Sequence, residues 1–84
     1  MKQDISAWGP FAPHISSEER RARLRCLQAV VHSLYGPFAR EMKNLLRTAE
    51  DDADALTRCR QSVAELTPEQ RRKIVTAYTG VEMP

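Results

Sequence analysis

The sequence of 84 residues contains little glycine and few aromatic residues: three glycines, and aromatic residues at only 6%. β-Strands favour aromatic and β-branched side chains, so this scarcity argues against a sheet. Arg, Ala, Leu and Glu are abundant instead, a composition that favours helices. The two cysteines, Cys26 and Cys59, are too few for a disulfide scaffold and do not form a CxxC pair. The sequence therefore predicts an all-α protein.

Long apolar runs and a secretory signal are also lacking. No apolar stretch approaches the roughly 18 residues of a membrane-spanning helix, and the N-terminus lacks the basic-then-apolar order of a signal peptide. We therefore expect a cytoplasmic protein with reduced thiols and no membrane partner. The net charge of +2 is too small to indicate nucleic acid by itself. A single domain of this length has a thin core, which usually needs a partner subunit or very regular helix packing.

Residues 1–15 predict an extended N-terminal arm. Pro10 and Pro13 forbid a regular helix there. Trp8 and Phe11 are too apolar for a fully solvated tail, so we expect them to pack on the helices or on another chain.

Helix boundaries are well marked in residues 16–80. Ser16 with Glu19 predicts a capping box at the start of a first helix, which Gly36–Pro37 ends. Pro37 suits the first turn of a second helix. Its expected apolar stripe consists of Phe38, Met42, Leu45, Leu46 and Ala49. A last helix begins with Thr67 as its cap, Pro68 as its first residue and Gln70 as the partner in the box, and Gly80 is a natural C-cap.

Two interpretations of residues 48–52 remain open. The acidic run from Glu50 to Asp54 is unfavourable at a helix C-terminus and favourable at an N-terminus, which favours a break. However, no Gly or Pro lies there, and the apolar spacing from Met42 to Leu66 stays in one register, which favours one long helix. The prediction is a small antiparallel bundle of three or four helices over residues 16–80, with the arm at 1–15 and a C-terminal tail at 81–84.

No pattern in the sequence predicts catalysis, a cofactor or a metal. Cys26 and His32 are six positions apart, which places them on different sides of a helix rather than together as zinc ligands. The acidic run lacks the alternating oxygens and the glycine of a calcium-binding loop. We therefore predict a protein that is not an enzyme.

The basic residues are clustered, which gives the molecule segregated charge. Ten of the 13 Lys and Arg fall into three groups: Arg20, Arg21, Arg23 and Arg25; Arg40, Lys43 and Arg47; and Arg71, Arg72 and Lys73. Such groups can bind phosphate, dock a protein or simply keep the chain soluble.

The leading hypothesis is a small regulator of bacterial or phage type that binds another protein as an adaptor, antiactivator, inhibitor or assembly factor. Its support is the segregated charge and a surplus of apolar residues. The candidate partner-binding residues are Trp8, Phe11, Arg20, Arg21, Arg40, Lys43 and Arg47. The alternative is a nucleic-acid-binding transcriptional regulator with a divergent helix-turn-helix whose turn is Tyr35–Pro37. A homodimer is a third class.

Overall fold

The computed structural model describes residues 7–82, and this part of the chain is all-α, with no strand. Its elements are η2 (Gly9–Phe11), α1 (Ser17–Tyr35), η3 (Gly36–Ala39), α2 (Arg40–Thr48), α3 (Ala53–Ala64) and α4 (Pro68–Glu82), where η denotes a 3-10 helix. The predicted fold class is confirmed.

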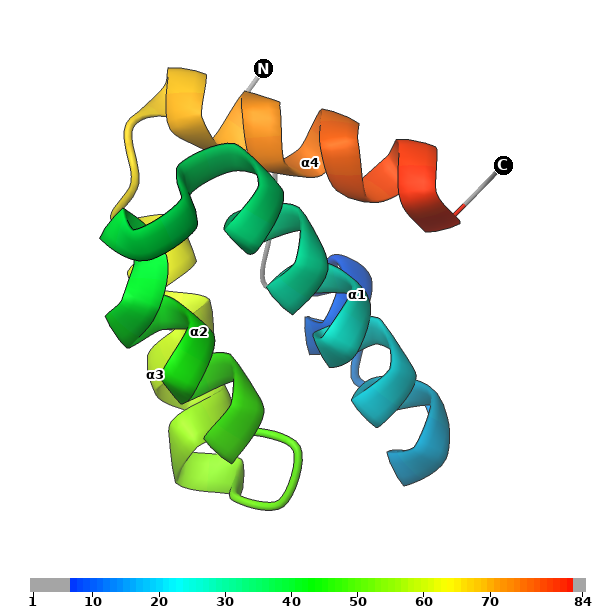
Figure 1. The fold of residues 1–84 in the computed structure, drawn as a ribbon. Coiled ribbons are helices and arrows are strands. Elements are labelled where there is room, and N and C mark those ends of the chain that lie inside the picture. The colour runs from blue at the N-terminus through cyan, green and yellow to red at the C-terminus, as the bar shows by residue number, and fades with distance from the viewer. Residues whose placement is uncertain (1–6, 83–84) are drawn as a thin grey trace.

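The helices form a compact globule of 29 × 28 × 26 Å. Helices α1 and α2 diverge from their junction at η3, while α2 and α3 lie side by side and run in opposite directions (Figure 1). Helix α4 crosses over the end where α1 passes into α2, and it packs against α1. The core lies between these helices and is closed by the N-terminal segment. Its fully buried large side chains include Leu24, Leu27, Val31, Leu46, Val63, Ile74 and Tyr78.

Both predicted ends of α1 are confirmed. The Ser16 hydroxyl accepts a hydrogen bond of 3.1 Å from the Glu19 backbone N–H, which satisfies one of the donors that a helix start leaves free. Gly36 follows the last turn at φ +54°, a left-handed conformation that favours glycine. Its N–H donates to the His32 carbonyl and closes the helix.

The chain breaks between α2 and α3, so the alternative of one long helix is wrong. Asp52 adopts an extended conformation and its carboxylate caps α3, accepting from the Asp54 N–H at 2.9 Å. Before it, the Glu50 and Asp51 N–H groups donate to carbonyls three residues back in a tight turn. The apolar spacing continues across the break because the apolar faces of α2 and α3 pack into the same core.

Helix α4 starts as predicted and ends later than predicted. Thr67 and Gln70 form a reciprocal capping box with two hydrogen bonds of 3.1 Å. The helix then passes through Gly80 to Glu82, so the prediction of Gly80 as a C-cap is wrong. A helix tolerates an interior glycine at a cost of about 1 kcal/mol when no proline follows at once to stop it. Of the predicted tail, Val81 and Glu82 belong to α4, and residues 83–84 lie outside the described residues.

The N-terminal arm folds back on α1. Residues 1–6 lie outside the described residues. Trp8 is extended, but η2 follows it, Pro13 and His14 form a turn and Ile15 a bend, so the described part of the arm is a series of tight turns rather than the predicted extended segment. Gly9 adopts φ +53°, and a Cβ there would approach the Tyr78 ring to 3.3 Å. The absence of a side chain thus lets the arm lie closely on α4.

Candidate functional site

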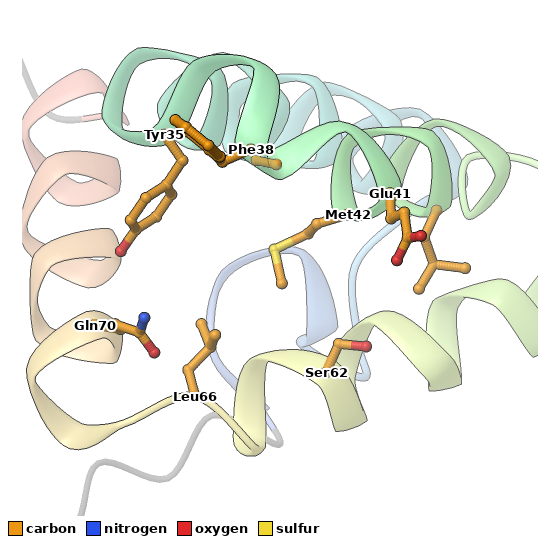
Figure 2. A pocket seen from close by; sticks show the side chains of 9 residues that line it. Tyr35, Phe38, Glu41, Met42, Ser62, Leu66 and Gln70 are labelled. Atoms are coloured by element: carbon orange, nitrogen blue, oxygen red, sulfur yellow. The ribbon is translucent and has the colours of Figure 1, made fainter.

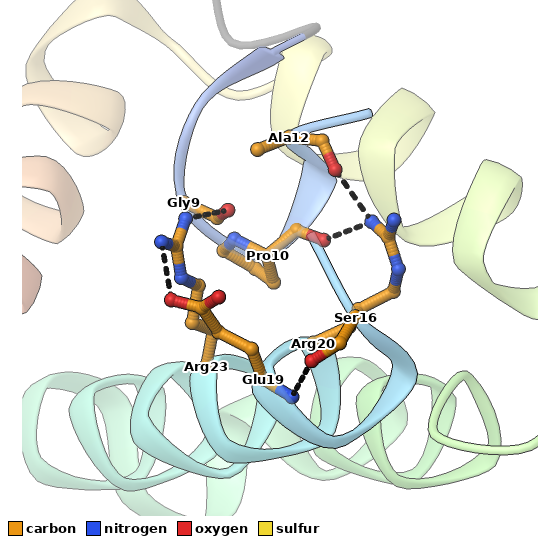
Figure 3. Close-up of polar contacts among 7 residues, drawn as sticks. All are labelled: Gly9, Pro10, Ala12, Ser16, Glu19, Arg20 and Arg23. Carbon is orange, nitrogen blue, oxygen red and sulfur yellow. Dashed lines mark hydrogen bonds and ion pairs between the residues drawn. The ribbon is translucent and has the colours of Figure 1, made fainter. Parts of the chain in front are cut away.

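Two arginines of the first basic group, Arg20 and Arg23, hold the arm in place. Arg20 Nη1 donates to the carbonyls of Pro10 at 2.8 Å and Ala12 at 2.9 Å, and Arg23 Nη1 donates to the Gly9 carbonyl at 3.0 Å (Figure 3). Arg23 also pairs with Glu19 at 2.8 Å. These two guanidinium groups therefore satisfy the Pro10 and Ala12 carbonyls and give the Gly9 carbonyl a second donor beside the Ala12 N–H.

The other arginines of this group meet the acidic turn between α2 and α3. Arg25 Nε and Gln28 Nε2 each donate to the Glu50 carboxylate at 3.0 Å, and Arg21 lies 3.6 Å from Asp51. The hydrogen bond from Gln28 and the charges of Arg25 and Arg21 hold the pKa of Glu50 below its ordinary value of 4.5, although burial opposes them. The segregated charges of the sequence thus attract each other within the molecule.

Two of the three candidate basic residues of α2 have no partner within the described residues. Arg40 and Arg47 are exposed, and their side chains make no hydrogen bond or ion pair within residues 7–82. Lys43 Nζ lies 2.8 Å from His32 Nδ1 on α1.

The aromatic residues predicted to bind a partner contact the protein's own core. Phe11 is only 4% exposed. The Trp8 ring is half-buried, with its centroid 4.8 Å from that of Tyr78 and 6.2 Å from that of Phe11. Both residues therefore fasten the arm to the helices in this structure.

A different aromatic residue, Phe38, is the most exposed large apolar side chain in the described residues, at 97%. Its expected place in the buried stripe of α2 is wrong. It lies in η3, and a 3-10 helix has about 3.0 residues per turn rather than 3.6, so its side chain falls out of the register of α2. The Gly36–Pro37 pair directly before Phe38 was the sequence signal for this irregular entry into α2.

Phe38 borders a groove of about 460 Å³ between α2 and the connection from α3 to α4 (Figure 2). The groove is lined mainly by apolar side chains, with a few polar ones at its rim: Tyr35, Phe38, Ala39, Glu41, Met42, Leu45, Ser62, Leu66 and Gln70. The Tyr35 hydroxyl is buried in its wall and has no hydrogen-bond partner within the described residues. We call Phe38 and this groove the Phe38 face.

The cysteines are separated and differ in environment. Cys59 is 1% exposed, and burial raises the pKa of its thiol to about 11, so it is almost entirely protonated at neutral pH. Cys26 is half-buried on α1. Within residues 7–82, no three His, Cys, Asp or Glu side chains gather in a cluster able to hold a metal ion.

The fold and the Phe38 face together define a small all-α protein with an apolar groove open at its surface. No helix in residues 7–82 is both long and apolar enough to span a membrane. Comparison with protein-family models, with curated proteins and with solved structures finds no match to this chain.

Proposed function

We propose that this protein acts by binding another protein through the Phe38 face, as an adaptor, antiactivator, inhibitor or assembly factor. The observation that carries the proposal is the 97% exposure of Phe38 beside a groove lined by Met42, Leu45 and Leu66. Burying a phenylalanine side chain is worth roughly 1.5–3 kcal/mol, so a partner that covers Phe38 gains directly from it. Aromatic residues and methionine are also enriched at the centres of protein interfaces.

Fewer basic side chains are available for the alternative function, binding of nucleic acid, than the sequence suggested. Arg20 is held by arm carbonyls, and Arg23 and Arg25 form ion pairs with Glu19 and Glu50, so these side chains are already engaged within the molecule. The exposed Arg40 and Arg47 of α2 remain for contacts to phosphate.

A pull-down from lysate, divided into nuclease-treated and untreated halves, tests the two functions. Tagged wild-type protein is compared with Phe38→Ser and with Leu34→Ser, a matched control because Leu34 is 39% exposed and does not line the groove. We expect a protein retained in both halves by the wild type and by Leu34→Ser, and lost by Phe38→Ser. Retention by Phe38→Ser at wild-type level would contradict the proposal. Retention that disappears only with nuclease would favour the nucleic-acid alternative.

A further inference from the structure

We infer that the partner protein presents a short acidic segment, and that this segment binds along a basic surface shared by α1 and α2; the inference rests on the proposed function. Three cations of α2, Arg40, Lys43 and Arg47, are three and four positions apart and so share one face of the helix. None of them lines the groove of the Phe38 face. The surface begins at Arg40, two positions after Phe38, so one partner can contact both.

Two contacts place this face of α2 beside α1. At one end, Lys43 Nζ lies 2.8 Å from His32 Nδ1. Towards the other end, Glu50 follows Arg47 by three positions, and its carboxylate accepts a hydrogen bond of 3.0 Å from Arg25 Nε. Arg25 and His32 are seven positions apart, which is about two turns, so they lie on the same side of α1. The basic surface consists of Arg25, Arg40, Lys43 and Arg47.

The charge of the basic surface is only partly compensated within the molecule. Arg40 and Arg47 are exposed and make no hydrogen bond or ion pair within residues 7–82, while Lys43 contacts an imidazole ring of α1. The Arg25 side chain is 71% exposed, whereas the Glu50 side chain that pairs with it is only 12% exposed. An approaching ligand therefore meets the cations and little of the carboxylate beneath them, so the surface attracts negative charge.

The length of the basic surface favours an acidic protein segment over nucleic acid. At about 1.5 Å per residue, the stretch of α2 from Arg40 to Arg47 spans about 10 Å. Directly beyond it lie the exposed Asp51, Asp52 and Asp54, in the turn after α2 and at the start of α3. A nucleic-acid duplex carries one charge per about 1.7 Å without interruption, so its phosphates beyond the surface would meet these carboxylates. A short segment with a few Asp or Glu side chains matches the cations and ends before this repulsion begins.

The experiment measures the binding of two labelled probes, a short oligoglutamate peptide and a DNA duplex, by fluorescence anisotropy at low salt. We expect wild-type protein to bind the peptide. The variant Arg40→Glu/Arg47→Glu should weaken this binding about tenfold or more, because it places like charges opposite the peptide. Raising the salt concentration should weaken the wild-type binding as well, since the contacts are exposed.

Two further variants separate the position of the charge from its amount. Arg58→Glu/Arg72→Glu is the matched control, since it makes the same change of net charge at exposed arginines of α3 and α4 outside the surface. It should change the peptide affinity by no more than about twofold, because salt screens distant charges. Arg40→Lys/Arg47→Lys keeps both charges and should bind the peptide as the wild type does. Urea unfolding checks that every variant is folded.

Three outcomes would overturn the inference. The first is a peptide that does not bind, or that the control variant weakens as much as Arg40→Glu/Arg47→Glu does. The second is a duplex that binds more tightly than the peptide and depends on Arg40 and Arg47, which would assign the surface to nucleic acid. The third is a wild type that sediments as a dimer which Arg40→Glu/Arg47→Glu dissociates, which would assign the surface to a second copy of the chain.

The proposed function and this inference fail separately in the pull-down. If Phe38→Ser loses the protein that the wild type retains, while Arg40→Glu/Arg47→Glu keeps it, the basic surface is wrong and binding through Phe38 stands. If only Arg40→Glu/Arg47→Glu loses it, the Phe38 face is wrong and the basic surface stands. If both variants retain it, both proposals are wrong.

Discussion

At the scale of single residues, the Glu50 carboxylate is the acidic group with the most side-chain hydrogen-bond partners in residues 7–82, Arg25 and Gln28 of α1. Its side chain is only 12% exposed. Through it, the turn between α2 and α3 is fixed to the first helix. A carboxylate with such partners is stabilising only while it is ionised.

Glu50 should make stability sensitive to acid. Its pKa is lowered in the folded protein, so its contribution is fully present above the ordinary value of 4.5 and is lost as pH falls through the lower folded value. We expect Glu50→Gln to cost about 1–2 kcal/mol at neutral pH and to flatten the loss of stability in acid. Urea unfolding measured across this pH range, with the exposed Glu65→Gln as control, checks this. An unchanged acid slope in Glu50→Gln would contradict it.

At the scale of elements, the arm and α1 behave as one unit. Arg20 and Arg23 contact three carbonyls of the segment from Gly9 to Ala12, while Trp8 packs on Tyr78 of α4. The arm thus links the first helix to the last.

Removing the Arg20 contacts should loosen the arm. Arg20→Met keeps an apolar stem but removes two charge-assisted hydrogen bonds, so we expect a loss of about 1.5–3 kcal/mol. Trp8 is the only tryptophan, and its fluorescence reports the arm directly. We expect emission shifted to the red at lower denaturant than in wild-type protein, and no such shift in the control Arg72→Met. Unchanged Trp8 emission and midpoint in Arg20→Met would show that the arm does not depend on Arg20.

At the scale of the whole molecule, some apolar side chains form the core and Phe38 is left exposed for binding in the proposed function. Leu46 and Phe38 both belong to the segment leading through α2, yet Leu46 is 0% exposed and Phe38 is 97% exposed. The ring of Phe38, on which the proposed interface depends, therefore lies outside the core.

This division predicts opposite effects on stability and binding. Leu46→Ala should cost about 2–5 kcal/mol, because it leaves a cavity in the core. Phe38→Ala should change the free energy of unfolding by less than about 0.5 kcal/mol while it weakens association. Urea unfolding measures the stability of both variants, and the pull-down measures the binding of Phe38→Ala. A large loss of stability in Phe38→Ala would mean that Phe38 packs within its own chain.

The sequence by itself determined the helical class and most helix starts. The capping boxes at Ser16 and Thr67 depend on residues only three positions away, so local pattern is enough to predict them. Gly36 ended α1 for the same kind of reason, a local backbone conformation that glycine adopts freely.

The tertiary structure decided the features on which function depends. Arg25 and Glu50 are 25 positions apart, and only the packing of α1 beside the α2–α3 turn brings them together. The break before Asp52 and the continuation through Gly80 could not be predicted either, since local propensity allowed both outcomes at each place. Phe38 became exposed because η3 rotates it away from the core, and a periodic pattern of apolar residues carries no information about such a local change of helix type.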